Sequence, residues 1–279
     1  MTISRRNLLK YGTGAAAAWA AGLRPGTAAA PRKIPVALQL YSVREACAKD
    51  LPRVLEAVAK MGYEGVEFAG YHGRSAAALR KLLDVNGVKC CGTHIGLNDL
   101  QGDALKRTVE FNQTTGNRFL IVSWMPDAYS KSLQTVKDTA RVFSEIAAKI
   151  KDGGLRVGYH AHGGDFQKID GQTAWDLLFT HASADVTMQI DIGNCLEAGG
   201  DPYATLKNFP GRSATVHLKE YGGPAAAVVG EGQVRWPEVF QVCQTTGGTE
   251  WYIVEHERAA GDPLDNVKRC LHNVRKLLA

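Results

Sequence analysis

The stretch VALQLYSVREACAKDLPRVLEAVAKMGYEGVEF, residues 36–68, holds one complete strand-and-helix unit followed by the strand of the next unit. The apolar run Val36–Tyr41 predicts a buried strand. Asp50 is a good helix N-cap, and the apolar residues after it recur every three or four positions up to Gly62, as on one face of a helix. Gly65–Phe68 then predicts a second strand. A strand, a helix and a strand in this order form the βαβ unit of parallel sheets.

The same rhythm continues to the end of the chain, where a last amphipathic pattern covers residues 263–278. An open doubly wound sheet would need a Gly-rich phosphate loop after its first strand, and Gln39–Arg44 contains no glycine. We therefore predict an α/β fold with a single (β/α)8 TIM barrel. Its eight predicted strands are Val36–Tyr41, Gly65–Phe68, Val88–His94, Phe119–Ser123, Arg156–His162, Thr187–Asp191, Thr215–Lys219 and Trp251–Glu255.

The N-terminal segment has the features of an export signal rather than of the barrel. Ser4–Lys10 carries a twin-arginine signature, Tyr11–Leu23 is uncharged, and Ala28–Ala30 supplies small residues suited to signal-peptidase cleavage. The uncharged run is short and rich in glycine and alanine, so a stable membrane anchor is not expected. We predict a cleavable signal peptide over residues 1–30 and a barrel over residues 31–279. Export by the twin-arginine route would place the protein in the periplasm or outside the cell.

Removal of the predicted signal peptide changes the charge of the chain. The full sequence has 33 Lys and Arg against 28 Asp and Glu, and the predicted signal peptide contains four basic residues but no acidic one. The mature chain would thus carry 29 basic and 28 acidic residues, a net charge of +1. A nearly neutral surface disfavours nucleic acid as a partner. The six cysteines contain no C-x-x-C pair, which favours buried free thiols over disulfides.

Polar residues close most of the predicted strands. Each of them alone is commonly a helix N-cap or one half of an ion pair. Asp191, His217 and Glu255 end three successive strands, however, and buried carboxylates that lie close together require a cation or a proton. The set therefore predicts a divalent metal site. Because the active site of a TIM barrel forms at the C-terminal ends of its strands, the candidates for chemistry are Glu67, His94, His160, His162, Asp191, His217 and Glu255.

Eight short motifs occur in an order that is typical of one family of barrels. They are Leu38–Arg44, Gly65–Phe68, Gly158–His162, Asp191–Asn194, Ala198–Pro202, Gly211–Arg212 with Val216–Lys219, Gly230–Gly232 and Ile253–Glu255. Together they make the chain resemble the xylose-isomerase-like TIM barrels of the sugar phosphate isomerase/epimerase family. That group also includes inosose dehydratases and the endonuclease IV type, but the predicted export and the near-neutral charge disfavour DNA repair.

The resemblance implies a metal site with a Glu from strand five, an Asp from strand six, a His from strand seven and a Glu from strand eight. The last three fall on Asp191, His217 and Glu255. Many members have Glu-Asn-His where this chain has His160-Ala161-His162, and a second pattern in the family places its Glu at Asp165. The fourth ligand is therefore either His160 or Asp165. A mixed set of oxygen and nitrogen ligands suits Mn²⁺, Mg²⁺, Co²⁺ or Zn²⁺, and we expect Mn²⁺.

The resemblance also implies a small-molecule substrate, a sugar or a sugar-like polyol. Family isomerases and epimerases remove a proton next to a carbonyl through a metal-stabilised enediolate, with one carboxylate on each side of the substrate. Glu255 would be one catalytic group, and Asp165 or His160 the other. Because this second group departs from the family pattern, a lyase or hydrolase acting on a 3-keto-glycoside or an inosose is the alternative. A non-catalytic periplasmic sugar-binding barrel is the alternative of another class.

Further residues are candidates for contact with the substrate: Glu67, His94, His162, Lys219 and Tyr41. Lys219 points to the same side of its strand as His217, so it would bind a substrate oxygen or polarise a carbonyl, unless it is a solvated lysine. Glu67 would accept sugar hydroxyls or cap a helix. His94 would face the substrate or pack in the core, and Tyr41 would stack on a sugar ring or pack. The sequence leaves a homo-oligomer open.

Overall fold

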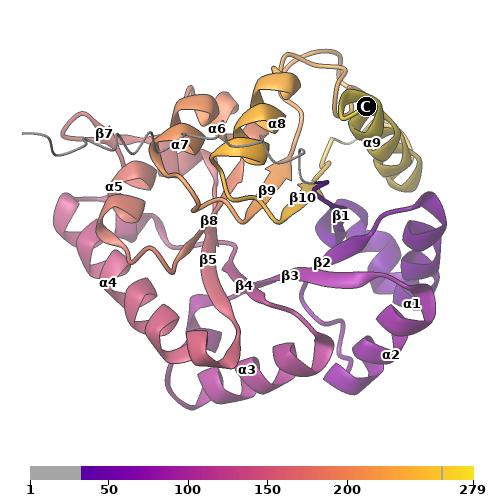
Figure 1. Ribbon diagram of the computed structural model, residues 1–279, viewed down its shortest axis with the longest axis horizontal. Helices are drawn as coiled ribbons and strands as arrows, with labels where there is room; N and C mark the ends of the chain where they lie inside the picture. Colours follow the sequence, from indigo (N-terminus) through magenta and orange to yellow (C-terminus); the bar gives the residue numbers. More distant parts are fainter. Residues whose placement is uncertain (1–32, 259) are drawn as a thin grey trace, which may run out of the picture. The chain divides into compact units, whose positions relative to one another are not determined.

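The computed structural model describes residues 33–258 and 260–279, and eight parallel strands of this part of the chain close into a barrel. Their order around the barrel is β1-β10-β9-β8-β5-β4-β3-β2 (Figure 1). The predicted (β/α)8 TIM barrel is therefore confirmed. The predicted signal peptide, residues 1–30, lies outside the described residues. The strands are β1 (Val36–Gln39), β2 (Gly65–Ala69), β3 (Lys89–Ile95), β4 (Phe119–Val122), β5 (Arg156–His160), β8 (Thr187–Asp191), β9 (Thr215–Leu218) and β10 (Trp251–Val254).

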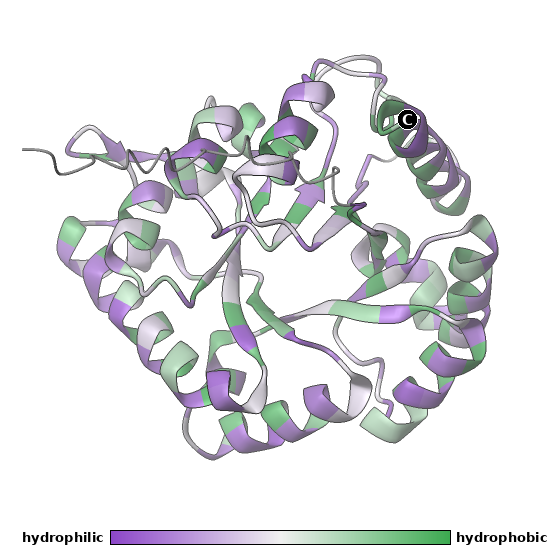
Figure 2. Ribbon diagram, in the orientation of Figure 1, coloured by the Kyte–Doolittle hydropathy of each residue, from purple (hydrophilic) through white to green (hydrophobic). Residues whose placement is uncertain are grey.

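The described α-helices surround this barrel (Figure 1). Figure 2 shows that they carry hydrophobic and hydrophilic residues together, as amphipathic helices do when one face packs against a sheet. Within the described ranges, no helix has the length and apolar character needed to cross a membrane. The helices are α1 (Arg44–Met61), α2 (Ala76–Asn86), α3 (Gly102–Thr115), α4 (Leu133–Ile150), α5 (Ala174–His181), α6 (Ile192–Glu197), α7 (Pro202–Asn208), α8 (Trp236–Thr245) and α9 (Pro263–Leu277).

Short elements occupy the loops between strands and helices. An antiparallel pair, β6 (Lys168–Ile169) and β7 (Gln172–Thr173), lies outside the barrel sheet. The 3-10 helices are η1 (Leu40–Val43), η2 (Leu97–Leu100), η3 (Asp127–Ser130), η4 (Lys151–Gly153) and η5 (Gly163–Phe166). Helix η1 follows strand β1 directly, and η5 follows β5 after Ala161 and His162, so both lie at the end of the barrel where TIM-barrel sites form.

Helix α1 differs from the sequence prediction at its start. It begins at Arg44, and its backbone leaves the helical region at Asp50 (φ −155°, ψ 80°). After this kink, Asp50 Oδ1 accepts a hydrogen bond from the Arg53 backbone N–H at 3.1 Å. The predicted N-cap is therefore confirmed for the second part of the helix. The turns before the kink bury Cys47 in the hydrophobic core, which gives them a tertiary stabilisation that the helical pattern did not reveal.

The inside of the barrel changes from apolar to polar along its axis. Near the N-terminal ends of the strands it holds two small clusters of apolar side chains. One contains Ala37 and Ile253, and the other contains Phe119 and Ile121. Because alternate residues of a strand point to the same face, Glu255 points inward like Ile253. Further along the strands the inward side chains are buried but polar: Gln39, Glu67, Gln189 and His217. The interior of the barrel therefore has an apolar layer toward the N-terminal ends of the strands and a layer of buried polar side chains above it.

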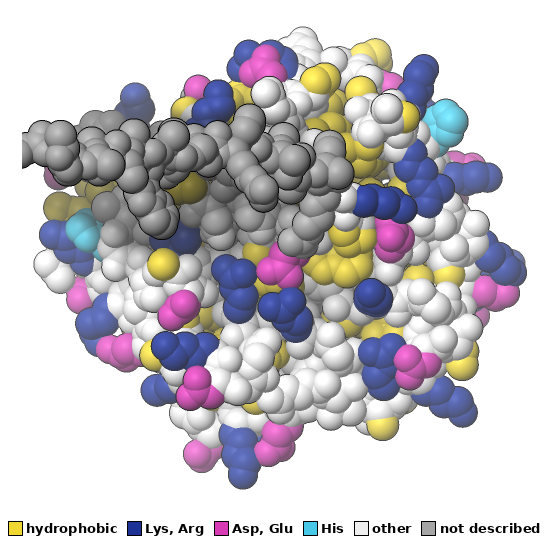
Figure 3. All heavy atoms as spheres, viewed as in Figure 1, with side chains coloured by type: hydrophobic (Ala, Val, Ile, Leu, Met, Phe, Trp, Pro, Cys, Tyr) yellow, Lys and Arg dark blue, Asp and Glu magenta, His cyan; other side chains and the backbone are white. Residues whose placement is uncertain are grey.

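The state of the cysteines and the distribution of surface charge can be compared with what the sequence predicts. All six cysteines are buried and free, so the predicted buried thiols are confirmed. On the face shown in Figure 3, basic and acidic side chains are interspersed over the described part of the chain.

Candidate metal and substrate site

Four side chains that can bind a metal meet at the polar end of the barrel. His160 ends β5, Asp191 ends β8, His217 lies in β9, and Glu255 follows β10. One potential ligand atom from each lies within 4.8 Å of those of the other three, and all four residues are buried. Since β5, β8, β9 and β10 are consecutive neighbours around the barrel, strand pairing itself brings the four together. We call His160, Asp191, His217 and Glu255 the ligand group.

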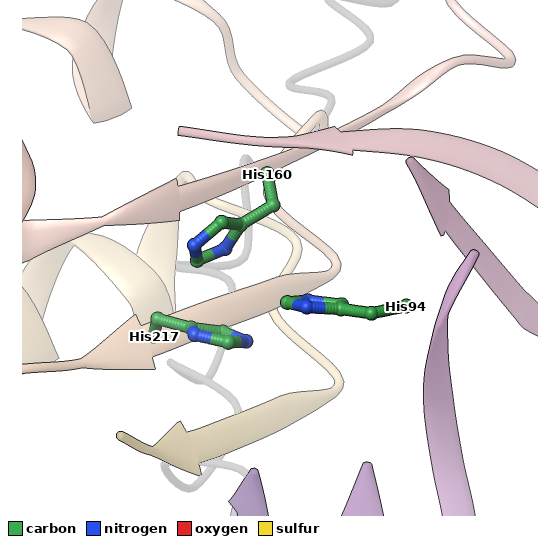
Figure 4. Close-up of side chains that lie close together, drawn as sticks. All are labelled: His94, His160 and His217. Carbon is green, nitrogen blue, oxygen red and sulfur yellow. The ribbon is translucent and has the colours of Figure 1, made fainter. Parts of the chain in front are cut away.

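His94, on strand β3, lies beside two members of the ligand group, His160 and His217 (Figure 4). Its ring centroid is 4.8 Å from that of His160 and 5.5 Å from that of His217, and the rings of His94 and His217 are stacked. Its Nε2 lies 2.8 Å from the side-chain oxygen of Gln189. The structure thus places His94 at the site, with one ring nitrogen already engaged by the protein.

Asp165 does not join the ligand group. It lies in η5, where Oδ1 accepts hydrogen bonds from the hydroxyls of Tyr129 and Tyr159, the latter at 2.9 Å. Its Oδ2 accepts from the His162 backbone N–H at 2.6 Å. Burial raises the pKa of Asp165 to about 6, although these hydrogen bonds oppose the rise. Of the two candidates for the strand-five position, the structure brings His160 to the other ligands and uses Asp165 to anchor the loop after β5.

Asp191 has one satisfied and one unsatisfied carboxylate oxygen. Its Oδ1 caps helix α6 by accepting from the Asn194 backbone N–H at 2.7 Å. Among the described residues, its buried Oδ2 has no hydrogen-bond partner. Burial raises the pKa of Asp191 to about 7, against the opposing attraction of Lys219. A buried carboxylate oxygen is rarely left without a partner, so the donor set and the orphaned oxygen both fit a bound cation.

His217 lies between two glutamates. Its Nδ1 faces Glu255 Oε2, and its Nε2 lies 2.7 Å from Glu67 Oε2. Burial opposes a charge on the imidazole, but the attraction of Glu67 and its bonds to both carboxylates raise the pKa of His217 to about 10. The Nδ1 atom also lies 4.0 Å from Asp191 Oδ2. In the protein without metal, a protonated His217 thus supplies the positive charge that the surrounding carboxylates need.

Glu67 lies beneath the ligand group and not at its substrate side. The side chain is fully buried, and its carboxylate accepts hydrogen bonds from Gln39 Nε2 and Gln189 Nε2, each at 2.8 Å, as well as contacting His217. The expectation that Glu67 receives substrate hydroxyls is therefore corrected, because protein groups already use both of its oxygens. Gln39 and Gln189 were missed by the sequence analysis, although each is a polar residue within an otherwise apolar strand.

Lys219 lies at the open side of the ligand group. It lines a pocket of about 560 Å³ together with Glu255 and Glu257. Its ammonium donates to Glu257, and its side chain is 18% exposed. Burial disfavours the charged amine, but the carboxylates of Asp191, Glu255 and Glu257 outweigh this effect and raise its pKa. Lys219 is thus a fixed positive charge in the pocket that Glu255 also lines.

His162 and Tyr41 lie at the surface near the strand ends. His162 is exposed, and its ring lies edge-on to that of His160 with a centroid distance of 4.8 Å. Tyr41 belongs to η1 and is 42% exposed, with the Arg44 guanidinium 4.5 Å from the centre of its ring. His162 therefore contacts the ligand group directly, whereas one face of Tyr41 is already covered by Arg44.

Curated proteins with similar sequences include a rhizopine catabolism protein and an inosose dehydratase. The chain is 22% identical over 271 residues to the rhizopine catabolism protein MocC of Rhizobium meliloti, and the match covers 82% of each chain. It is 23% identical over 264 residues to an inosose dehydratase of Bacillus thuringiensis (strain Al Hakam), covering 78% of this chain and 87% of the relative.

Solved structures of other proteins share this fold. A sugar phosphate isomerase/epimerase from Parabacteroides distasonis ATCC 8503 superposes with a TM-score of 0.77 at 17% identity, covering 90% of this chain and 98% of that one. The IolI protein, solved with a zinc atom, superposes with a TM-score of 0.70 at 13% identity, covering 88% and 98%. At these identities the likeness shows the fold alone.

The family is shown by the sequence itself. The profile described as xylose isomerase-like TIM barrel matches residues 55–277, which is most of the described barrel. The match begins in helix α1 and ends at the last residue of α9, and it therefore contains all four members of the ligand group. The chain belongs to the xylose isomerase-like TIM barrel family.

Proposed function

We propose that this chain is a divalent-metal-dependent isomerase or epimerase that removes the proton next to the carbonyl of a sugar or keto-sugar. The observation that carries the proposal is the ligand group, whose four ligand atoms lie within 4.8 Å of one another in a buried site. Asp191 Oδ2, which has no hydrogen-bond partner within residues 33–258 and 260–279, is the group that a cation would satisfy. Relatives with similar sequences and folds, named as inosose dehydratase and sugar phosphate isomerase/epimerase, agree with this chemistry.

We propose His160, Asp191, His217 and Glu255 as the metal ligands. Asp165 is not among them, because two tyrosines and a backbone N–H hold its oxygens. Two imidazoles and two carboxylates suit Mn²⁺, Co²⁺ or Zn²⁺ better than Mg²⁺, which prefers oxygen ligands and retained water. Mn²⁺ is our first candidate, and the zinc atom of the IolI protein makes Zn²⁺ the second.

The pocket residues have separate proposed roles. A bound divalent metal would act as a Lewis acid on the substrate carbonyl and make the adjacent proton more acidic. Glu255 lines the pocket and would accept that proton. Lys219, on the same wall, would donate a hydrogen bond to a substrate oxygen. His94 and His162, beside the ligand group, would contact the rest of the substrate, with Tyr41 at the rim.

A lyase or hydrolase acting on a 3-keto-glycoside or an inosose is the second candidate. Two-sided epimerisation needs a second acid/base group opposite Glu255, and the sequestered Asp165 does not supply it. Elimination needs only removal of the first proton, followed by departure of a leaving group. The similarity to an inosose dehydratase also favours elimination. Both candidates begin with the same proton removal by Glu255.

Proton exchange tests the common first step. The Mn²⁺-loaded protein would be incubated in D₂O with keto-sugars, 3-keto-glycosides and inososes, and loss of the α-proton signal would be followed by NMR. We expect exchange with at least one substrate, and loss of that exchange in Glu255→Gln. A rearranged sugar would identify an isomerase or epimerase, and an unsaturated or cleaved product would identify a lyase or hydrolase. Tight binding with no exchange for any substrate would contradict the proposal and favour a sugar-binding barrel.

The choice of the strand-five ligand gives a direct prediction. His160→Ala is expected to weaken the binding of Mn²⁺ by about 100-fold or more, because it removes a ligand. Asp165→Asn, which alters the hydrogen bonds of a loop outside the ligand group, is expected to change the dissociation constant by no more than about threefold. Isothermal titration calorimetry of both variants measures this difference. The reverse order of effects would assign the ligand to Asp165.

We also propose export by the twin-arginine route to the periplasm, as a mature chain of residues 31–279. The proposal rests on the signature around Arg5 and Arg6. Fractionation of cells that express the chain with both arginines replaced by lysine tests it, since the variant should stay in the cytoplasm. Whether the mature chain forms a homo-oligomer would follow from light scattering of the same preparation.

A further inference from the structure

Glu67 is a charged group in a place where TIM barrels usually carry branched apolar side chains. Its side chain is fully buried, and its carboxylate is bonded by Gln39, Gln189 and His217. Removing a carboxylate from water costs free energy, and well-packed apolar side chains would often give an equally stable or more stable interior. The presence of Glu67 therefore calls for a role that an apolar residue could not fill.

The contact with His217 indicates that role. An ionised carboxylate can only accept hydrogen bonds, so the Nε2 atom that lies 2.7 Å from Glu67 Oε2 must carry a proton. The lone pair available to a metal is then on Nδ1, which is the nitrogen that faces Glu255 and lies 4.0 Å from Asp191 Oδ2. We infer that Glu67 is a positioning residue, which holds His217 in the tautomer and ring orientation that present Nδ1 to the metal. This inference rests on the proposed metal-dependent function.

The pairing of β2 with β3 makes room for this carboxylate. The register shifts between Val66 and Glu67, so that Val66 pairs with Cys90 while Glu67 pairs with Gly92. Cys91 is thus the extra residue of a β-bulge, a device that commonly redirects side chains next to active sites. A Cβ atom at position 92 would lie 2.3 Å from Glu67 Oε1. Glycine at this position is therefore required for Glu67 to occupy its observed place.

Gln189 supports the same arrangement from the other side. Its Nε2 donates to Glu67 Oε1 at 2.8 Å and to Thr215 Oγ1 at 3.0 Å. Its Oε1 then lies 2.8 Å from His94 Nε2 and 3.1 Å from His160 Nδ1. The side-chain amide of Gln189 thus connects Glu67 with His160, a second proposed metal ligand. Hydrogen-bonded groups of this kind orient metal ligands, and their loss typically weakens metal binding by about 10- to 100-fold.

The first test compares two glutamates that lie close together in the sequence. Glu67→Gln keeps the size of the side chain but removes its charge, and Glu64→Gln makes the same change at an exposed position. Calorimetric titration with Mn²⁺ and with Co²⁺ alone is expected to show about 10- to 100-fold weaker binding for Glu67→Gln and no change for Glu64→Gln. The visible spectrum of the Co²⁺-loaded Glu67→Gln variant should also differ from wild type, because the geometry of a ligand changes.

A second pair of variants keeps the inference testable if Glu67→Gln folds poorly. Gly92→Ala places a methyl group against Glu67 Oε1 and should weaken metal binding at least about tenfold in the otherwise unchanged chain. In a Glu67→Ala background the methyl group meets no carboxylate, so Gly92→Ala should have no further effect on the dissociation constant. Equal effects in both backgrounds would show that Gly92 does not act through Glu67 and would overturn this part of the inference.

The outcomes separate this inference from the proposed function. Wild-type metal affinity and an unchanged Co²⁺ spectrum in a folded Glu67→Gln variant would overturn the positioning role and leave the metal site intact. Failure of the wild-type chain to bind any of these metals would overturn the proposed function itself. A nitrogen-15 NMR spectrum of the Zn²⁺-loaded protein adds a direct readout, since the inference requires His217 to be metallated at Nδ1 and protonated at Nε2. Metallation at Nε2 would contradict it.

Discussion

Asp191→Asn is expected to abolish tight metal binding and, at the same time, to stabilise the metal-free protein. The substitution removes the negative charge from a proposed ligand, so Mn²⁺ affinity should fall by at least about 100-fold. Asparagine still caps helix α6, because its side-chain oxygen can accept the bond from Asn194. The charge that is lost is one that burial disfavours, as the raised pKa of Asp191 indicates.

The stabilisation of the Asp191→Asn variant should depend on pH with a definite sign. The pKa of Asp191 rises from 3.8 in its ordinary state to about 7 in the folded protein. The wild-type chain therefore loses stability as the pH rises from about 4 to about 7, by at most about 4 kcal/mol, and the variant does not. Urea unfolding of both proteins without metal should give equal free energies near pH 4 and a more stable variant at pH 8.

Asp201→Asn is the matched control for this prediction. Asp201 caps α7, accepting from the backbone N–H groups of Tyr203 and Ala204 at 3.0 Å each, and it is exposed. Its replacement should leave both metal affinity and the pH dependence of stability unchanged. A metal-free Asp191→Asn variant that is less stable than wild type at pH 8 would contradict the assignment of Asp191 as a destabilising buried charge.

His217→Ala is expected to produce a large loss of stability. The imidazole lies between the buried carboxylates of Glu67 and Glu255, and its removal leaves both without their positive partner. Breaking a buried ion pair from one side typically costs about 3–5 kcal/mol. For a domain of this size the melting temperature should fall by about 10 °C, measured by calorimetry at neutral pH. Metal binding should be lost as well.

The loss of stability in His217→Ala should depend on pH, because the ion pairs that it breaks form only while His217 and the two glutamates are charged. Burial raises the pKa of both glutamates, but His94 and His217 lower that of Glu67 and His217 lowers that of Glu255, while the pKa of His217 is raised to about 10. The stabilisation by the wild-type pairs is thus lost as the pH rises through about 10 and as the carboxylates protonate in acid. The difference between His217→Ala and wild type should therefore be largest between about pH 5 and about pH 6.5, and it should shrink as the pH rises from there to about 10.

Two further variants separate charge from packing. His272→Ala, on the exposed side of α9, should leave the melting temperature unchanged. In the double variant Glu67→Gln, His217→Ala, one of the two unpartnered charges is removed, so part of the lost stability should return. A double variant that is less stable than His217→Ala alone would show that the cavity left by the imidazole, and not the unpaired charge, dominates the cost.

The strand pattern alone was sufficient to predict the barrel and three of the proposed ligands. Parallel strands buried on both faces read as short continuous apolar runs, and their repetition with helices between them predicted the closed sheet. Asp191, His217 and Glu255 each come at or near the end of such a run, on strands that follow one another along the chain. Since consecutive βα units become neighbours in a barrel, position in the sequence was enough to predict that these side chains meet.

Only the tertiary structure shows that His160, and not Asp165, lies with the other proposed ligands, and that Glu67 is buried beneath them. Asp165 is held by Tyr129, which belongs to another βα unit, and no local pattern predicts that contact. The burial of Glu67 depends on the β3 bulge that brings Gly92 opposite it, and its contact with His217 joins β2 to β9, which are not adjacent in the sheet. Alternation along a strand determines which side chains point inward, but distances across the barrel depend on how the whole sheet closes.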